Sequence, residues 1–475
     1  MGAGPGGYAA AFYAADCGRK VTLVERETRL GGVCLNRGCI PSKALLHAAH
    51  TVSLARESAH RGITFANPQI DLAQLRQWKE SILQRLGQGV AQLAQKRGVQ
   101  VLAGRGYFED SNTLRVETST GQQFIRYQKA IIATGSKPAM PRAFDLGNPR
   151  VMTSTEALEV EEIPARLLVI GGGYIGMELG TVYATLGSEV VVVEALEAVL
   201  TGADPDLARP VAARARKTFK EVRIKAKVLS MATRGQQIQV EIEHGGQRLE
   251  ELYDRVLVAV GRVPNGGDLG LENTKVTCDE KGFIVVDEHQ QSTDPSIFAI
   301  GDIAGGVLLA HKATREGRIA VEAIVGESGS VGDFVVPAVV FTDPELAWCG
   351  LTESEAQQKG IPVEVVKFPW GASGRALTFD RPDGMTKLLI DPQSERILGV
   401  GIVGVGAGEL IAEGVLAVEM GATAKDLALS VHPHPTLSET LMECAEVFYG
   451  HATHALARRA EARTTSARRA EAGAD

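Results

Sequence analysis

The chain has 475 residues, enough for about three domains, and its 44% hydrophobic content with 53 glycines is typical of α/β layers joined by glycine turns. The net charge of −7 argues against a nucleic-acid-binding surface, and no apolar run reaches the ~18 residues that a membrane-spanning helix needs. With six cysteines in so long a chain and no apparent signal peptide, we expect a soluble, cytoplasmic protein with no nucleic-acid or membrane partner.

The chain opens on a glycine loop, Gly2-Ala3-Gly4-Pro5-Gly6-Gly7. A helical stretch, a strand over residues 21–24 and the acid Glu25 follow, which is the order of a βαβ dinucleotide-binding unit. In such a unit Gly2 allows the tight turn, Gly4 the close approach of a pyrophosphate, and Gly7 the packing of the helix. Glu25 would accept hydrogen bonds from ribose hydroxyls.

The strand that normally precedes such a loop is absent, because only Met1 stands before Gly2. We therefore expect the sheet of this domain to lack its first strand, through a misplaced start or a truncation. Neighbouring strands would lose hydrogen-bond partners, so the sequence predicts weak or substoichiometric retention of the dinucleotide.

Two cysteines separated by four residues, Cys34 and Cys39, follow within the run Gly31–Lys43. A disulfide that closes so short a loop is easily made and broken, which indicates redox chemistry. Pro41 suits the first turn of a helix, so Cys39 would lie near a positive helix end that favours its thiolate. The alternatives are a zinc knuckle or two idle buried cysteines, but zinc needs about four ligands and the other cysteines are scattered.

Two kinds of element separate this run from the next motif. An amphipathic helix is predicted over about Leu72 to Lys96, and a buried strand with a glycine turn over Lys129–Gly135. A similar strand and turn recur at Val256–Arg262. This pattern is expected where a chain crosses between two nucleotide-binding domains.

A second glycine loop, Gly171-Gly172-Gly173-Tyr174-Ile175-Gly176, follows a proper strand over residues 167–170. It leads through a helix to a strand over residues 190–193 and to Glu194. Two loops that are each followed by an acid about 20 residues later predict two dinucleotide sites. Glu194 would repel a 2′-phosphate, and no arginine cluster follows it within residues 195–202, so NAD is favoured over NADP.

From about residue 335 the pattern changes to strands, such as those over residues 335–341 and 385–390, mixed with helices in a third unit. The last 25 residues read as a solvated, disordered tail. A single histidine is more often structural than catalytic. His434, however, stands between two prolines, and Glu439 follows five residues later. That carboxylate can hold the imidazole and raise its basicity.

Over about residues 2 to 450 the chain resembles the disulfide flavoprotein reductases, and among them the lipoamide dehydrogenases of bacterial type. The motifs that carry the resemblance are Gly2 to Gly7, Cys34 to Lys43, Ala133-Thr134-Gly135, Gly171 to Gly176, Val260-Gly261-Arg262-Val263-Pro264-Asn265, Phe298-Ala299-Ile300-Gly301-Asp302, and His432-Pro433-His434-Pro435-Thr436-Leu437-Ser438-Glu439.

The resemblance implies an α/β fold with two Rossmann-like domains, for FAD and NAD, and an α+β C-terminal dimerisation domain. The expected limits are residues 1–145 and 263–332 for the FAD-binding and central parts, 146–262 for NAD, 333–450 for the interface domain, and 451–475 for the tail. Dinucleotide-binding residues implied by the motifs are Gly2, Gly4, Gly7, Glu25, Lys43, Ala133, Thr134, Gly135, Gly171, Gly173, Gly176, Glu194, Gly261, Gly301 and Asp302.

In the same way, the resemblance implies roles for single residues. Asp302 would bond the ribityl chain of the flavin, with Gly301 permitting the approach. Lys43 would pair with Glu178 beside the reactive edge of the flavin, and we expect each of the two on a helix that begins at a nucleotide loop.

The implied reaction is the oxidation of protein-bound dihydrolipoamide with reduction of NAD. His434, held by Glu439, would take the proton of the substrate, Cys34 would exchange disulfides, and Cys39 would contact the flavin. Because this histidine comes from the partner subunit, the resemblance implies a homodimer with no active monomer. It would serve the lipoyl domains of 2-oxoacid dehydrogenase or glycine-cleavage complexes.

One position departs from the pattern, since Tyr174 stands where lipoamide dehydrogenases commonly carry an aliphatic residue and glutathione reductases a tyrosine. The alternatives are a reductase of the same family that acts on glutathione or mercuric ion, and a non-catalytic flavin-binding scaffold subunit. The tail lacks the vicinal cysteines of a mercuric reductase. Cys34, Cys39, His434 and Glu439 all speak against a scaffold.

Overall fold

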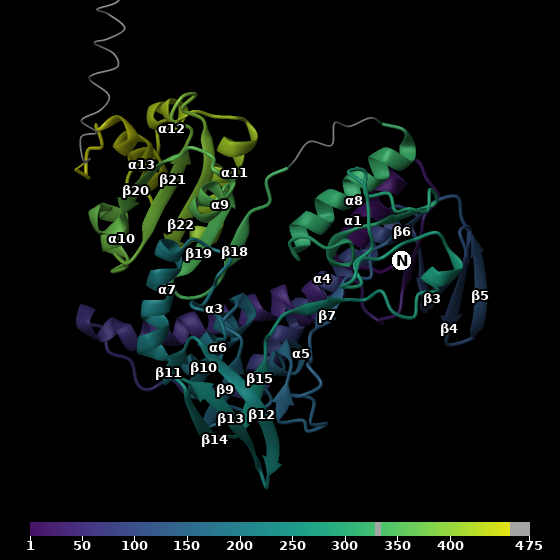
Figure 1. Ribbon diagram of the computed structural model, residues 1–475, viewed down its shortest axis with the longest axis horizontal. Helices are drawn as coiled ribbons and strands as arrows, with labels where there is room; N and C mark the ends of the chain where they lie inside the picture. The colour runs from purple at the N-terminus through teal and green to yellow at the C-terminus, as the bar shows by residue number, and fades with distance from the viewer. Residues whose placement is uncertain (328–333, 457–475) are drawn as a thin grey trace, which may run out of the picture. The chain divides into compact units, whose positions relative to one another are not determined.

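The computed structural model of the chain describes residues 1–327 and 334–456 (Figure 1). They form two compact units, one of residues 1–200 with 215–334 and one that joins 201–214 to the residues from 335 on. Residues 451–456 of the predicted tail contain no helix or strand, and the part from residue 457 on lies outside the described residues.

The first glycine loop leads directly into a helix, as its sequence predicts. Helix α1 (Pro5–Asp16) begins after Gly4, and β1 (Thr22–Glu25) follows it. β1 pairs in parallel with β2 (Gln100–Ala103), and β6 (Ala130–Ile132) pairs in parallel with β17 (Ile297–Ala299). The first parallel sheet therefore comes as two separate two-stranded pieces in the described part of the chain.

The backbone of Met1 and Gly2 connects these two pieces. The amide of Gly2 donates to the carbonyl of Val24 at 2.8 Å, and the carbonyl of Met1 accepts from the amide of Ala133 at 2.8 Å. The amino group of Met1 donates to the carbonyl of Ile131 at 2.8 Å. The glycine loop thus lies where the predicted missing strand would end, between β1 and β6.

Long helices flank this region. The predicted helix over residues 72–96 is α4 (Leu72–Lys96), whose first turn is capped by the Asp71 carboxylate. Three further helices carry residues of the candidate site described below: α2 (Gly32–Arg37), α3 (Cys39–Glu57) and α8 (Ala310–Val325). β3 (Arg105–Asp110), β4 (Thr113–Thr118) and β5 (Gly121–Arg126) add an antiparallel sheet.

The second glycine loop belongs to a complete parallel sheet of five strands in the order β11-β10-β9-β15-β8. The loop lies between β9 (Arg166–Ile170) and α6 (Tyr174–Leu186). The valine-rich run of β10 (Glu189–Val193) is buried almost throughout, as expected for a parallel strand covered on both faces. The sheet is completed by β8 (Val151–Met152), β11 (Glu221–Arg223) and β15 (Arg255–Val258).

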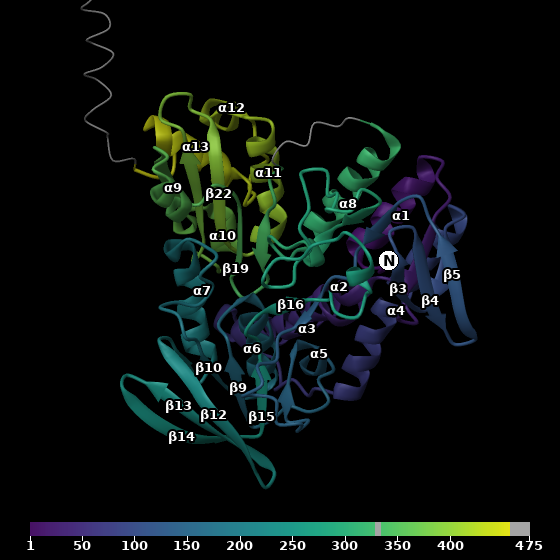
Figure 2. The same cartoon turned by 45° about the vertical axis from the view of Figure 1, so that its right-hand side comes forward.

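An antiparallel sheet packs against this parallel sheet (Figure 2). It consists of β12 (Ala226–Arg234), β13 (Gln237–His244) and β14 (Gln247–Tyr253). Alternate residues of β13, Ile238, Val240 and Ile242, join the core of the parallel sheet. The remaining elements of this unit are α5 (Ser154–Ala157), β7 (Ser136–Pro138), β16 (Arg262–Pro264) and the short 3₁₀ helices η1 (Ser58–Arg61), η2 (Leu271–Asn273) and η3 (Gly301–Ala304).

The second unit is the predicted α+β domain. Its antiparallel sheet has the order β18-β19-β22-β21-β20, with β18 (Ala338–Val340), β19 (Glu345–Gly350), β20 (Glu364–Pro369), β21 (Met385–Ile390) and β22 (Ile397–Gly404). Its core gathers around the fully buried Trp370. The helices are α9 (Glu353–Lys359), α10 (Gly374–Thr378), α11 (Ala407–Glu419), α12 (Ala424–Leu429) and α13 (Glu439–Tyr449), with η4 (Trp370–Ala372); α7 (Pro205–Thr218) contributes its first part.

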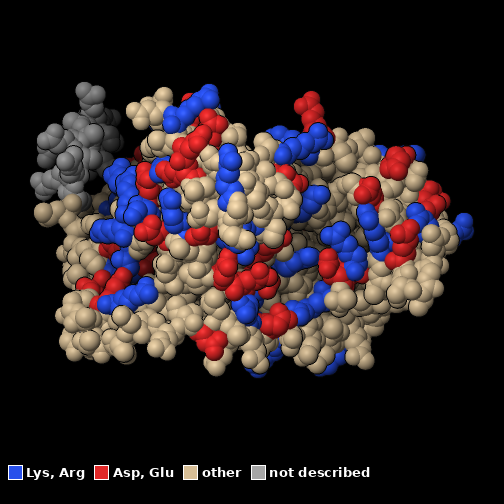
Figure 3. Space-filling view, turned by 90° about the horizontal axis from the view of Figure 1, so that it is seen from below, with Lys and Arg blue, Asp and Glu red and all other residues tan. Residues whose placement is uncertain are grey.

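Among residues 1–327 and 334–456, no helix is long and apolar enough to cross a membrane. On the face drawn in Figure 3, Lys and Arg side chains are interspersed with Asp and Glu rather than gathered into one basic field. That face therefore offers no extended positive surface for nucleic acid.

Candidate functional site

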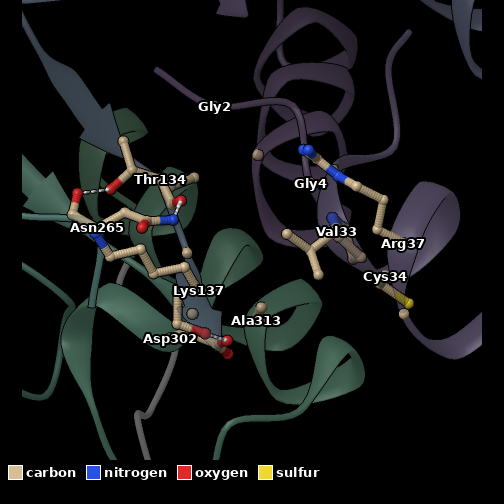
Figure 4. Close-up of a pocket in the computed structure, with 18 of the residues that line it drawn as sticks. Gly2, Gly4, Val33, Cys34, Arg37, Thr134, Lys137, Asn265, Asp302 and Ala313 are labelled. Atoms are coloured by element: carbon tan, nitrogen blue, oxygen red, sulfur yellow. Dashed lines mark hydrogen bonds between the residues drawn. The ribbon is translucent and has the colours of Figure 1, made fainter. Parts of the chain in front are cut away.

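The first unit contains a cavity of about 420 Å³ into which the predicted redox and nucleotide motifs converge (Figure 4). Its walls come from the first glycine loop, the cysteine run, the ends of β6 and β17, and the start of α6. The predicted site residues that line it are Gly2, Gly4, Gly7, Glu25, Cys34, Cys39, Lys43, Ala133, Thr134, Gly135, Glu178, Gly301 and Asp302.

The glycine loop offers backbone donors to this cavity. α1 begins at Pro5 with Gly4 as its N-cap and carries no acidic residue in its first turn, so its positive end can accept an anion. A Cβ on Gly7 would lie 1.9 Å from the carbonyl oxygen of Gly2, so only glycine allows the helix to start so close to the loop. Gly7 therefore allows the helix to pack close to the turn, as the sequence predicts.

The two acids that follow the glycine loops make the same contacts. Glu25 accepts from the amide of Ala3 at 2.7 Å and from the amide of Glu27 at 3.0 Å. Glu194 accepts from the amide of Gly172 at 2.6 Å and from that of Leu196 at 2.7 Å. Each carboxylate is thus held against the backbone beside its own loop.

The glycines of the second loop, Gly171, Gly173 and Gly176, do not line the cavity, although Tyr174 and Ile175 of the same loop do. Gly173 is the N-cap of α6, and Gly176 lies so close to Gly171 that a Cβ there would be 2.0 Å from its carbonyl oxygen. Gly261, also outside the cavity lining, accepts a hydrogen bond at its carbonyl from the amide of Ala139 at 2.9 Å.

The two cysteines occupy different helices at the cavity wall. Cys34 lies in α2 and Cys39 is the first residue of α3, with Gly38 between the helices. A hydrogen bond from the Cys34 thiol, together with the charge of Lys43, lowers the pKa of Cys39 to about 7. The same hydrogen bond, with burial, raises the pKa of Cys34. In the reduced pair Cys39 is therefore the thiolate.

A zinc site at these cysteines has no support in the described residues. There, the one cluster of three side chains close enough to hold a metal ion is Asp204, Asp206 and Glu353. The ammonium of Lys387, fully buried, lies among these carboxylates at 2.6–3.1 Å, and Lys367 pairs with Asp206 at 2.6 Å. A cluster of carboxylates around a buried lysine is typical of structural ion pairing.

An ion pair reaches the cavity from two helices far apart in sequence. Nζ of Lys43 on α3 donates to Oε2 of Glu178 on α6 at 2.8 Å, and the Ser42 hydroxyl donates to the same oxygen at 2.9 Å. The Glu178 side chain is 4% exposed. Only α6 begins at a glycine loop, so the expectation that both helices do was wrong for Lys43, whose helix begins at Cys39.

Asp302 lies in η3 and its carboxylate faces the cavity beside Ala313 (Figure 4). It accepts a hydrogen bond from the hydroxyl of Ser136, and Nε of Arg262 donates to that hydroxyl at 2.7 Å. Ser136 and Arg262 are site residues that the sequence did not single out. The available signal was their position, because each directly follows a glycine turn at the end of a buried strand.

Thr134 is tied to Asn265 by two hydrogen bonds (Figure 4). Its hydroxyl donates to the backbone carbonyl of Asn265 at 3.0 Å, and the side-chain amide of Asn265 donates to the backbone carbonyl of Thr134 at 2.9 Å. This pair joins the two strand-and-turn segments that the sequence predicts at the crossings between nucleotide domains.

Tyr174, the position that departs from the lipoamide dehydrogenase pattern, also lines the cavity. Burial raises the pKa of its hydroxyl to about 12, so the phenol is neutral at physiological pH. A neutral phenol beside the cavity can donate one hydrogen bond.

The second unit carries the predicted base. Nδ1 of His434 lies 2.8 Å from Oε1 of Glu439, whose other oxygen accepts from the amide of Thr436 at 2.7 Å. Burial by itself would raise the pKa of Glu439, but the hydrogen bonds from the Thr436 amide and from His434 keep that pKa below its usual value. The imidazole itself is 77% exposed, as a group that meets a substrate must be.

His432, two residues earlier, has a different environment. Its side chain is 6% exposed, with Nε2 2.7 Å from Glu413 and Nδ1 2.9 Å from the carbonyl of Ser430. Both ring nitrogens are engaged, so His432 orients the loop and does not compete with His434 as a base.

Two family models match the chain. The model described as pyridine nucleotide-disulphide oxidoreductase matches residues 1–317, and the dimerisation domain of pyridine nucleotide-disulphide oxidoreductases matches residues 336–445.

Curated relatives match almost the whole chain. Dihydrolipoyl dehydrogenase of Vibrio parahaemolyticus serotype O3:K6 is 45% identical over 454 residues, which cover 95% of each chain. Dihydrolipoyl dehydrogenase of Geobacillus stearothermophilus is 44% identical over 454 residues, 96% of each chain.

Solved structures share the fold. LpdA from Mycobacterium tuberculosis superposes with a TM-score of 0.88 at 26% identity, over 94% of this chain and 98% of that one. The HOCl-induced flavoprotein disulfide reductase RclA from Escherichia coli has a TM-score of 0.83 at 29% identity, with the same two coverages.

Proposed function

Because the chain belongs to the pyridine nucleotide-disulphide oxidoreductase family, we propose that it oxidises protein-bound dihydrolipoamide to lipoamide and reduces NAD to NADH. Relatives that carry the name dihydrolipoyl dehydrogenase match it at 42–45% identity over nearly its full length. The observation that carries the proposal is the asymmetric pair of thiols at the wall of a nucleotide-sized cavity, with Cys39 poised as a thiolate.

FAD fits the residues of this cavity. A Cβ on Gly2, Gly6 or Gly7 would lie within 3 Å of a backbone carbonyl oxygen, so the loop stays close to its neighbours and would present helix-end amides to a pyrophosphate. Glu25, which accepts from the amide of Ala3, would bind a ribose. Asp302 would hold the ribityl chain, while Lys43 and Glu178 would lie beside the reactive edge. When bound, FAD supplies the two-electron relay between the dithiol and NAD. The loop from Gly171 to Gly176, with Glu194, would hold NAD.

The chain's own residues carry the sulfur chemistry. Starting from the Cys34–Cys39 disulfide, a substrate thiolate attacks Sγ of Cys34, forms a mixed disulfide and releases Cys39 as a thiolate. The second substrate thiolate then attacks the substrate sulfur of the mixed disulfide, so lipoamide leaves and Cys34 takes up a proton. The substrate has lost two electrons, which now reside on the dithiol.

His434 takes the proton of the first substrate thiol, and the proton of the second thiol passes to Cys34 as lipoamide leaves. The carboxylate of Glu439 holds Nδ1, so that the other ring nitrogen can act as the base. The active form we propose is a homodimer, with this histidine supplied across the interface. Lipoyl arms of 2-oxoacid dehydrogenase or glycine-cleavage complexes would be its substrates, in the cytoplasm.

The test is NADH formation from dihydrolipoamide and from a dihydrolipoylated carrier domain by the purified, FAD-loaded protein. We expect turnover with both, and a fall in kcat of about 10²- to 10⁴-fold in His434→Gln. His451→Gln, a change of an exposed histidine of the same unit, should keep full activity. A protein that ignores dihydrolipoamide but reduces glutathione disulfide with a nicotinamide cofactor would instead be a reductase of the alternative kind.

A further inference from the structure

The turn that carries Asp302 is tied at both ends to one helix. At one end, the amide of Gly301 donates to Oε2 of Glu316 on α8 at 2.7 Å. At the other end, Nζ of Lys312 on α8 donates to the carbonyl of Gly305 at 2.8 Å. The two α8 side chains also pair with each other at 2.5 Å, one helical turn apart.

This ion pair is buried and has no part in the sulfur chemistry. The side chains of Lys312 and Glu316 are 11% and 6% exposed. Burial raises the pKa of Glu316, and Lys312 is the main influence against that shift. A buried ion pair adds little stability by itself, because desolvation offsets the attraction, so it is best understood as fixing a conformation.

The turn needs such fixing. Gly301 and Gly305 have φ angles of +73° and +79°, and a glycine with no side chain to pack moves easily between conformations. The turn also lies close against the helix, since a Cβ on Gly301 would be 2.9 Å from Cβ of Ala313. The middle of the turn is anchored by Ile303, whose carbonyl accepts from the amide of Ile284 at 2.8 Å, and the two α8 side chains hold its ends at Gly301 and Gly305.

The Asp302 side chain is held separately, from the opposite side. Its carboxylate accepts from Ser136, whose hydroxyl and carbonyl in turn accept from Arg262 at 2.7 and 2.8 Å. Nε of Arg262 lies 3.7 Å from the Asp302 carboxylate. The two glycine ends of the turn are thus held by α8, and the Asp302 side chain by Ser136 and Arg262.

We propose that Lys312 and Glu316 are positioning residues for flavin binding, which act through Asp302 by fixing the backbone of its turn. The proposal rests on the proposed function, since it takes Asp302 as a ligand of the flavin. Loss of either partner leaves the other charge buried and unpaired, so the turn shifts and the affinity for FAD falls.

The test measures FAD binding to the apoprotein by flavin fluorescence, with Lys312→Met, Glu316→Gln and the double variant. Glu316→Gln keeps the shape and an acceptor for the Gly301 amide, so it should fold. We expect each single change to raise the Kd for FAD about tenfold, and the double variant to recover part of the loss because no unpaired charge remains.

A matched control is Arg255→Met. Like Lys312, Arg255 is largely buried, at 15% exposure, and donates to a carboxylate, Glu162, and to a backbone carbonyl, Pro149. It lies outside the cavity lining, so its loss should leave the Kd for FAD unchanged. An equal effect of this control would show general destabilisation and overturn the proposal.

A double-mutant cycle with Asp302→Asn separates positioning from a structural role. If Lys312 acts through Asp302, the Lys312→Met change should add little to the Kd once Asp302 is altered. Fully additive effects, or single variants with the wild-type Kd, would refute the proposal. Because FAD binding is measured without dihydrolipoamide, a wild-type protein that binds FAD but does not turn over this substrate would refute only the proposed function.

Discussion

At the scale of single residues, the decisive feature is that two identical side chains differ in acidity. Cys34 and Cys39 share one hydrogen bond, which the Cys34 thiol donates, so the negative charge collects on Cys39. The ammonium of Lys43 adds to the same effect. A reduced pair with one thiolate and one thiol suits a site in which one sulfur exchanges with substrate and the other faces a flavin.

This asymmetry predicts a pH-dependent spectrum. A thiolate next to an oxidised flavin gives a long-wavelength absorption band, so the band should be strong at pH 8 and fade toward pH 6, as Cys39 with its pKa of about 7 takes up a proton. Anaerobic titration with dihydrolipoamide measures it. Cys39→Ser should abolish the band.

Cys34→Ser should keep the band but shift its midpoint, since the serine hydroxyl replaces the thiol that donates the stabilising hydrogen bond. Cys278→Ser, at an exposed site outside the cavity lining, is the control and should leave the band unchanged. Persistence of the band in Cys39→Ser would show that the thiolate next to the flavin is not Cys39.

At the scale of elements, the site depends on how closely α1 and α8 approach. A Cβ on Gly6 would lie 2.8 Å from the carbonyl oxygen of Ala313, and one on Gly317 would lie 2.9 Å from the carbonyl oxygen of Gly6. The first helix brings its positive end to the cavity, and the second holds the Asp302 turn. The two glycines therefore set the distance between two walls of the site.

Gly6→Ala should force these helices apart. We expect a loss of about 1–3 kcal/mol in the free energy of unfolding, because overpacking against backbone cannot be relieved by a rotamer change. Denaturant titration measures this loss. Gly89→Ala, in α4 where a Cβ meets no atom within 4 Å, should instead stabilise by about 0.5–1 kcal/mol. A Gly6→Ala protein as stable as wild type would contradict the packing argument.

At the scale of the whole molecule, the second unit exposes four large apolar side chains shortly before His434 in the sequence. Leu416 and Met420 at the end of α11, Leu429 in α12 and Val431 are all more than half exposed, with Val431 at 98%. The same residues lie within the match to the dimerisation domain, residues 336–445. Apolar side chains so exposed favour burial against a second subunit.

Charges placed at these exposed apolar positions should therefore weaken the dimer. We expect the double change Leu416→Glu and Met420→Glu to raise the monomer fraction in analytical ultracentrifugation, and the activity to fall in proportion, because a monomer lacks the imidazole of its partner. Phe124→Glu is the control, since Phe124 is 63% exposed on β5 of the first unit. Full activity in a monomeric variant would refute the shared site.

Much of this protein follows from local sequence. The two glycine loops, the acids behind them, the helix of residues 72–96 and the strand of residues 385–390 were all predicted, because each depends on spacing and periodicity within a few turns of chain. The overall fold class was predicted too, since the motifs follow one another in the order of a known family.

The tertiary structure alone decided the contacts that tune the site. Glu178 meets Lys43 across 135 residues, and Arg262 reaches Ser136 across 126. The pairing of Lys312 with Glu316 has ordinary helical spacing, but its grip on the Asp302 turn depends on where α8 packs. Acidity and position in a buried site arise from neighbours brought together by folding, and residue order alone does not specify those neighbours.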